Sequence, residues 1–189
     1  MTLQEYIASL RGRTVAVIGI GVSNTPLLRL LLREGIAVTA CDRSDRAKLG
    51  ALAEELEAAG AVLRLGDGYL QDLDQDVIFR TPGLRPDVPE LEAARAKGST
   101  ITSEMEVFFE VCPCPIIAVT GSDGKTTTTT IIAELLRAAG HTVHVGGNIG
   151  HPLLAEADTI RPTDWAVLEL SSFQLMTMTH SPHILSLIH

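Results

Sequence analysis

Short apolar runs rich in β-branched residues alternate along the chain with longer amphipathic stretches, many of them closed by glycine. This alternation is typical of βα units arranged on a mainly parallel sheet. The first run, Val15–Ile18, leads through a glycine turn into a helix that is expected to end at Gly35. Thr25 is the expected N-cap of that helix, and Pro26 its first residue. The pattern therefore predicts an α/β fold.

The pattern continues in two blocks separated by Cys112-Pro113-Cys114-Pro115, where two prolines favour an extended connection. We expect the domain boundary there. Before it the pattern predicts strands at 37–41, 62–65 and 77–79 and helices at about 45–59 and 88–97, a Rossmann-like rhythm. After it the pattern predicts strands at 116–119, 142–145, 166–170 and 184–188 and a helix at 126–139. The prediction is a Rossmann-like domain over residues 1–111 and a second α/β domain over residues 112–189.

The last predicted strand, 184–188, is strongly apolar and is expected to be buried, with nothing following it. Domains usually end on their surface, so we expect the second domain to be truncated.

Composition narrows the class of protein. Hydrophobic residues make up 46% of the chain and charged residues 20%, which is enough for a buried core. A net charge of −8 with 4% aromatic residues argues against a nucleic-acid surface. The N-terminus does not resemble a secretory signal, no segment approaches the roughly 20 apolar residues of a membrane span, and the cysteines form no disulfide or CxxC set. We expect a cytoplasmic protein whose cysteines are core or linker thiols.

The stretch 120–127 lies between an apolar strand and a helix, where main-chain N–H groups can surround phosphate oxygens. It forms a P-loop of tighter form, because Val119 stands where the eight-residue pattern has its first glycine. Lys125 is expected to offset phosphate charge, and the Thr126 hydroxyl to complete a Mg²⁺ shell. The predicted ATP-binding residues are Gly121, Ser122, Asp123, Gly124, Lys125, Thr126 and Thr127.

A P-loop needs a second acid on its metal side, and Glu169 follows the apolar run 165–168 at the carboxyl end of a predicted strand. We therefore expect Glu169 to bind Mg²⁺ together with Thr126. The alternative is a surface glutamate at a strand end.

An earlier glycine turn, 19–24, also follows a strand and precedes a helix, with Asp42 at the next strand end. This indicates nucleotide binding, but Asn24 replaces the third glycine of the dinucleotide fingerprint and weakens an NAD interpretation. Asp42-Arg43-Ser44 could bind a ribose and a phosphate, or Asp42 could cap the following helix. The loop 146–150 could likewise place the Asn148 amide against a ligand, or it could be a plain turn. No histidine shows metal or triad spacing.

Three strings, 120–127, Gly146-Gly-Asn-Ile-Gly150 and Leu168-Glu-Leu-Ser-Ser-Phe-Gln-Leu175, together resemble the Mur ligases of peptidoglycan synthesis. The resemblance covers the whole chain and is closest to the members that add D-glutamate to UDP-N-acetylmuramoyl-L-alanine. The string after Glu169 distinguishes these members from sister ligases and from folylpolyglutamate synthases, which have other residues there. The loop 81–83 also fits a family loop that helps to hold the uridine nucleotide.

The resemblance implies an ATP- and Mg²⁺-dependent ligase that phosphorylates the alanyl carboxylate, after which the amine of D-glutamate attacks the acyl phosphate. Lys125 and Glu169 would be its catalytic residues. Asn148, Ser171 and Gln174 would line the shared site. The uridine nucleotide would contact Gly21, Val22, Ser23, Asp42, Arg43, Thr81, Pro82 and Gly83.

Two residues depart from the family pattern: Asn24, where a small residue is common, and Asp123, where Asn is usual. The family also continues with a modified lysine, a second metal ligand and an amino-acid-binding domain, so this chain alone is expected to be inactive. Two alternatives remain, namely another Mur-type or folylpolyglutamate-type ligase and a non-catalytic nucleotide-binding module.

Overall fold

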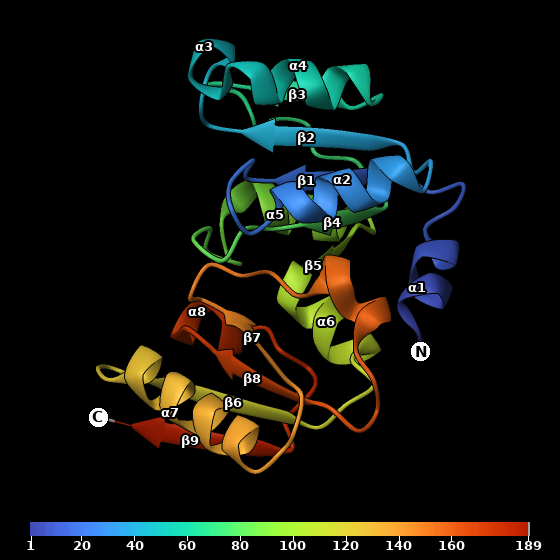
Figure 1. Cartoon of the computed structure of the whole chain (residues 1–189). Helices are drawn as coiled ribbons and strands as arrows, with labels where there is room; N and C mark the ends of the chain where they lie inside the picture. Colours follow the sequence, from blue (N-terminus) through green and yellow to red (C-terminus); the bar gives the residue numbers. More distant parts are fainter. Residues whose placement is uncertain (189) are drawn as a thin grey trace. The chain divides into compact units, whose positions relative to one another are not determined.

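The computed structural model describes residues 1–188 in two compact units (Figure 1). The N-terminal unit is Tyr6–Glu104, and the P-loop unit is Met1–Glu5 with Met105–His189. Each unit contains its own parallel sheet with helices, so the predicted α/β class is confirmed. The predicted domain boundary at residue 112 stays a prediction.

The N-terminal unit has five parallel strands in the order β3-β2-β1-β4-β5. Its strands are β1 (Val15–Ile18), β2 (Val38–Asp42), β3 (Val62–Leu65), β4 (Val77–Phe79) and β5 (Thr100–Thr102). The helices along this part of the chain are α1 (Leu3–Ser9), α2 (Thr25–Arg33), α3 (Arg46–Leu49), α4 (Ala51–Ala58) and α5 (Pro89–Ala96). The strand order reverses between β1 and β4, and ligands of open α/β sheets bind at such a point, beyond the carboxyl ends of the strands.

Two local predictions in the N-terminal unit were wrong. The N-cap of α2 is Asn24, not Thr25, so that Thr25 is the first helical residue and Pro26 the second. The helix expected over 45–59 is divided into α3 and α4 by Gly50, whose φ of 54° lies in the left-handed region that glycine tolerates.

The P-loop unit has four parallel strands in the order β7-β8-β6-β9. Its strands are β6 (Ile116–Gly121), β7 (Val143–Gly147), β8 (Trp165–Glu169) and β9 (Ile184–Ile188). Its helices are α6 (Glu104–Val111), α7 (Lys125–Ala138) and α8 (Ser172–Leu175), with a 3₁₀ helix, η1 (Leu154–Thr159). Helix α7 packs against β6, β7 and β8, and the carboxyl ends of these three parallel strands meet at one edge of the sheet.

Strand β9 forms where it was predicted, but the expectation that it is buried was wrong. Within residues 1–188 it pairs with β6 alone and is an edge strand, and Ile184, Leu185 and Leu187 are all more than half exposed. An apolar run shows that a strand can be buried, but burial also requires neighbours on both sides and both faces.

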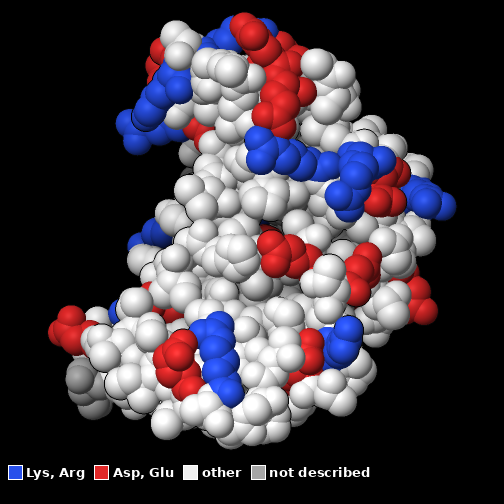
Figure 2. Space-filling model, in the orientation of Figure 1, with Lys and Arg blue, Asp and Glu red and all other residues white. Residues whose placement is uncertain are grey.

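Acidic and basic side chains are interspersed on the face of the molecule in Figure 2. Exposed ion pairs of the chain include Arg29–Glu55 and Arg46–Glu57. Pairs of this kind contribute little to stability, since water screens them. Within residues 1–188, no helix is both long and apolar enough to cross a bilayer.

Candidate functional site

The phosphate loop joins β6 to the N-terminus of α7, as predicted. Gly121 and Gly124 have φ angles of 145° and 71°, which residues with a Cβ rarely adopt. A Cβ at Gly121 would also lie 1.9 Å from the carbonyl oxygen of Ile188. Both glycines are therefore required by the main chain, and Gly124 turns it directly into the first turn of α7.

The Lys125 ammonium lies across this loop. Its Nζ donates to the carbonyl oxygens of Gly121 at 2.9 Å and Ser122 at 3.1 Å. These contacts hold a positive charge beside the N-terminus of a 14-residue helix. The charge and the free N–H groups of a first helical turn both favour an anion at this position. Ser122, Asp123 and Thr127 are exposed around it.

Glu169 is the centre of a polar cluster of residues at the start of α7 and at the ends of β7 and β8. Its side chain is buried, at 3% exposure, and both of its carboxylate oxygens accept hydrogen bonds. Thr126 Oγ1 donates to Oε2 at 2.6 Å, and Asn148 Nδ2 donates to Oε1 at 2.9 Å. The structure thus brings Thr126, Asn148 and Glu169 together, and the alternative of a surface glutamate does not apply.

The register of the sheet explains this meeting. Glu169 on β8 pairs with Val119 on β6 and with Gly147 on β7, so β7 and β8 end side by side, while β6 continues to Gly121. The main-chain N–H of Asn148 donates to the Glu169 carbonyl oxygen at 2.8 Å. A Cβ at Gly147, whose φ is 93°, would lie 2.2 Å from that oxygen. Gly147 therefore permits the close approach that places Asn148 on Glu169.

Ser171 and Gln174 interact with each other. They form a capping box at the start of α8, in which the Gln174 N–H donates to Ser171 Oγ and the Ser171 N–H donates to Gln174 Oε1. Gln174 is buried at 5% exposure. The capping box gives these two residues a structural role that the sequence analysis had not identified, although serine followed three residues later by glutamine is its signature.

In the N-terminal unit, the turn after β1 meets the loop after β4 at the reversal of strand order. A Cβ at Gly19, whose φ is 93°, would lie 2.9 Å from Thr81 Cβ, so the two loops are in direct contact. The Leu84 N–H donates to the Thr81 carbonyl oxygen and closes a turn around Pro82 and Gly83. The structure therefore brings the predicted nucleotide residues after β1 and β4 to one place.

Asp42, at the end of β2, is tied to the same turn. Its carboxylate accepts from the N–H groups of Ile20 and Ser44, each at 2.6 Å. The helix that follows is capped instead by Asp45, which accepts from the Lys48 N–H at 2.8 Å. The capping alternative for Asp42 is thus wrong.

The predicted residues around Asp42 are accessible. Arg43 lies beside Ser44, Asp45 and Lys48 in an open depression of about 540 Å³. Gly21 and Val22 are exposed, and Val22 has 70% of its surface in contact with solvent.

Two buried polar residues lie beside this site, of which the sequence analysis noted Asn24 only as a departure from glycine and did not consider Arg80. Asn24 is 1% exposed, and its Nδ2 donates to the Ile18 carbonyl oxygen at 2.8 Å, which fixes the turn to β1. Arg80 is also 1% exposed and donates to the Leu84 carbonyl oxygen at 3.1 Å, which braces the Thr81–Gly83 loop. An arginine directly after a fully apolar strand is the signal that could have identified Arg80.

The histidines contribute structural contacts. His144 Nε2 donates to Asp164 Oδ2 at 3.0 Å, and the Ile116 N–H donates to His183 Nδ1 at 3.1 Å. The hydrogen bond from His144 lowers the pKa of Asp164, and the N–H of Arg161 contributes to the same shift. Over residues 1–188, no three side chains of His, Cys, Asp or Glu lie close enough to hold a metal by themselves.

Comparison with known proteins agrees with these motifs. Residues 119–185 match the Mur ligase middle domain. The UDP-N-acetylmuramoylalanine–D-glutamate ligase of Acetivibrio thermocellus is 51% identical over 183 residues, which are 96% of this chain and 39% of that protein. The ligases of the same name from Clostridium botulinum (strain Hall) and Symbiobacterium thermophilum are 53% and 52% identical, over 91% and 89% of this chain and 38% and 37% of their own.

Among solved structures, the UDP-N-acetylmuramate-alanine ligase of Thermotoga maritima is 22% identical and has a TM-score of 0.47, over 84% of this chain and 37% of that chain. The α/β fold itself is established by the two parallel sheets. The chain spans less than two fifths of the length of its curated relatives. The resemblance that the motifs indicated is confirmed: residues 119–185 match the Mur ligase middle domain, and 96% of the chain is similar to the ligase of Acetivibrio thermocellus.

Proposed function

We propose that this chain provides the nucleotide-substrate site and the phosphate loop of an ATP-dependent ligase. The reaction joins D-glutamate to the alanyl carboxyl group of UDP-N-acetylmuramoyl-L-alanine through an acyl phosphate. The observation that carries the proposal is the buried carboxylate of Glu169, held by Thr126 from the phosphate loop and by Asn148. The substrates are taken from the relatives, which are UDP-N-acetylmuramoylalanine–D-glutamate ligases.

ATP is proposed to bind with its β- and γ-phosphates over residues 121–127. The Lys125 Nζ now lies on two loop carbonyl oxygens, and a phosphate oxygen is a stronger partner for an ammonium ion. In this position Lys125 offsets the charge that spreads over the equatorial oxygens during phosphoryl transfer. Thr127 and the first N–H groups of α7 complete the phosphate site.

The donor set suits Mg²⁺, which prefers oxygen ligands from a carboxylate, a hydroxyl and phosphates. Thr126 Oγ1 and Glu169 Oε2 are already 2.6 Å apart, so both oxygens can face one ion. An ion held by Thr126 and Glu169 would offset the negative charge of the phosphates. Asn148 keeps its hydrogen bond to the other oxygen of Glu169 and so orients the carboxylate.

The uridine nucleotide is proposed to bind where the loops after β1, β2 and β4 meet in the N-terminal unit. Gly21, Val22 and Ser23 provide an accessible main chain, and Arg43 provides a positive charge for a diphosphate. The Thr81–Gly83 loop closes the other side, held against Gly19. Asn148, Ser171 and Gln174 are assigned to the part of the P-loop unit that receives the alanyl end.

The proposed compartment is the cytoplasm. The reaction consumes ATP, and all three cysteines are free, as is usual where thiols are kept reduced.

The test is calorimetric titration of the 189-residue chain with UDP-N-acetylmuramoyl-L-alanine. Separate titrations with NAD and with folate represent the alternative functions. Gly19→Ala should weaken binding of UDP-N-acetylmuramoyl-L-alanine at least about tenfold, because the new Cβ displaces Thr81. Gly12→Ala is the matched control, since Gly12 has a similar φ of 76° but open space around it. Binding of NAD or folate alone would instead support the corresponding alternative, and no binding by the folded chain would contradict the site.

A further inference from the structure

Cys112 and Cys114 lie in the segment between α6 and β6 and serve no purpose in the proposed ligase site. Their Sγ atoms are 3.6 Å apart, and the Cys112 Sγ also lies 3.6 Å from the Cys114 carbonyl oxygen. The Cys112 side chain is thus folded back over residue 114. A disulfide needs an S–S distance of about 2.05 Å, so the two sulfurs need to approach by little more than an ångström and a half.

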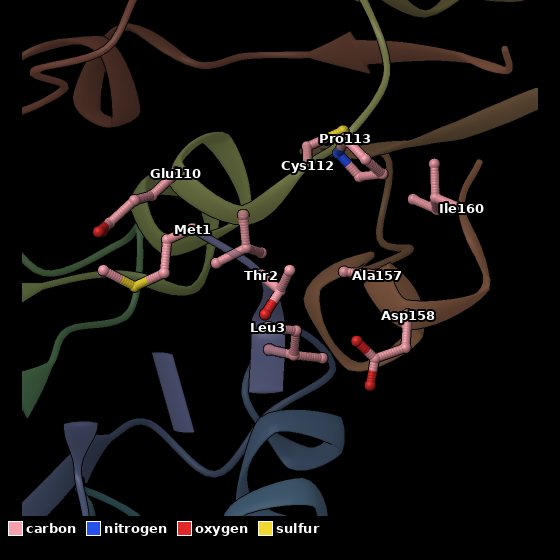
Figure 3. Close-up of a pocket in the computed structure, with 10 residues that line it drawn as sticks. Met1, Thr2, Leu3, Glu110, Cys112, Pro113, Ala157, Asp158 and Ile160 are labelled. Atoms are coloured by element: carbon pink, nitrogen blue, oxygen red, sulfur yellow. The ribbon is translucent and has the colours of Figure 1, made fainter. Parts of the chain in front are cut away.

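The two thiols differ in access. Cys114 is buried at 2% exposure, whereas Cys112 is partly exposed. Cys112 also lines a cavity of about 370 Å³, together with Met1, Leu3, Pro113 and Ile160 (Figure 3). All ten lining residues belong to the P-loop unit. Cys112 is therefore the accessible member of the pair, and Cys114 is not among the residues that line the cavity.

The pKa values of the two thiols also differ, in the direction that matches their access. The hydrogen bond between the two thiols lowers the pKa of Cys112, and the same contact together with burial raises the pKa of Cys114. The thiolate is the nucleophilic form of cysteine, so Cys112 is the attacking thiol and Cys114 the resolving one.

We propose that Cys112-Pro113-Cys114 is a thiol–disulfide exchange site, at which a small disulfide entering the cavity converts the two thiols into an intramolecular disulfide. The Cys112 thiolate attacks one sulfur of the small disulfide, forms a mixed disulfide and releases one thiol. The Cys114 sulfur then attacks Cys112, its proton is lost to solvent, and the second small thiol leaves. The protein loses two electrons and two protons overall, and the small disulfide is reduced to two thiols.

The third cysteine provides an internal control. Cys41 is fully buried in the N-terminal unit, and burial raises the pKa of its thiol to about 11. It has neither the access nor the thiolate character that exchange requires.

The experiment incubates the chain with oxidised glutathione, quenches with acid, labels the free thiols with N-ethylmaleimide in denaturant, and counts adducts by mass spectrometry. The wild-type chain should fall from three adducts to one, and Cys41→Ser from two to none. Dithiothreitol should restore both values. Peptide mapping should place the disulfide between residues 112 and 114.

Two variants separate exchange from nonspecific oxidation. Cys114→Ser should accumulate a glutathione mixed disulfide at Cys112, because the resolving thiol is missing. Cys112→Ser should react at least about tenfold more slowly, because the remaining Cys114 is buried and holds its proton. A wild-type chain that keeps three free thiols, or equal reaction rates in the two variants, would overturn the proposal.

Discussion

Thr126 Oγ1 and Glu169 Oε2 lie 2.6 Å apart although 43 residues separate them in the chain. The hydrogen bond joins the first turn of α7 to the carboxyl end of β8, and Asn148 joins β7 to the same carboxylate. The start of α7 and the ends of β7 and β8 thus meet at one acidic group. This cluster, with Lys125 beside it, is the physical basis of the proposed ATP and Mg²⁺ site.

Replacing Glu169 with glutamine should separate metal binding from nucleotide binding. Glu169→Gln keeps the size of the side chain but removes its negative charge and sets an amide N–H against Thr126 or Asn148. In the presence of Mg²⁺ we expect Glu169→Gln to bind ATP at least about tenfold more weakly than wild type. Without Mg²⁺ the two affinities should differ little. Titration of the wild-type and Glu169→Gln chains with ATP, with and without Mg²⁺, measures this difference. Glu134→Gln, on an exposed ion pair of α7, is the control, and an unchanged Mg²⁺ dependence in Glu169→Gln would contradict the metal assignment.

Gly147 should tolerate no side chain. Gly147→Ala places a Cβ 2.2 Å from the Glu169 carbonyl oxygen, whereas Gly150→Ala meets open space at a similar φ of 87°. Backbone strain costs both variants roughly 1 to 2 kcal/mol, and the displaced strand should cost Gly147→Ala about 2 kcal/mol more. Urea unfolding followed by the fluorescence of Trp165, the single tryptophan, reports on β8 directly. Equal losses in the two variants would show that the close approach to Glu169 is absent.

The hydroxyl of Thr129 is a source of instability. It is fully buried in α7 and makes no hydrogen bond within the described residues. Thr129→Val keeps the shape and removes the unpaired group, so the free energy of unfolding should rise by roughly 1 kcal/mol. Thr130→Val is the matched control, because the Thr130 hydroxyl donates to the Thr126 carbonyl oxygen at 2.8 Å. A loss of stability in Thr129→Val, measured by Trp165 fluorescence in urea, would show that the hydroxyl has a partner.

Asp164 should make the P-loop unit sensitive to acid. The hydrogen bond from His144 lowers the pKa of Asp164 in the folded chain below the unfolded value of about 3.9. Its contribution to stability is therefore present above about pH 4 and is lost as the pH falls through the folded-state pKa. Asp164→Asn should be less stable than wild type at pH 7, and the difference should shrink below pH 4.

Urea unfolding at a series of pH values checks this, with Asp158→Asn as an exposed control from the same unit. A stability difference for Asp164→Asn that stays constant from pH 7 to acid would contradict the role of the carboxylate.

Periodicity predicted most strands to within one or two residues, because inward-facing residues of parallel strands form compact apolar runs. The order of motif residues along the chain placed the loop 120–127 between a strand and a helix and Glu169 at a strand end, and the structure agrees with both positions. The exposure of β9 could not be predicted in this way, because burial depends on neighbours that lie elsewhere in the sequence.

The partners of side chains were harder to predict than their positions. Asp42 and Asp45 are both acidic residues before a helix, and only the structure shows that Asp45 is the cap while Asp42 binds the glycine turn. Ser171 and Gln174 were assigned to a ligand site, whereas their mutual hydrogen bonds also begin α8. Such choices depend on which N–H groups the folded chain leaves free.

Residues 121–127 are proposed to bind the phosphates of ATP through Lys125. Calorimetric titration of the 189-residue chain with ATP and Mg²⁺ tests it, with Lys125→Ala beside Lys97→Ala, an exposed lysine of the N-terminal unit. Loss of a charge-assisted contact removes roughly 1.5 to 3 kcal/mol, so Lys125→Ala should bind ATP at least about tenfold more weakly, and Lys97→Ala should match wild type. Unchanged ATP affinity in a folded Lys125→Ala chain would contradict the assignment of the phosphate loop.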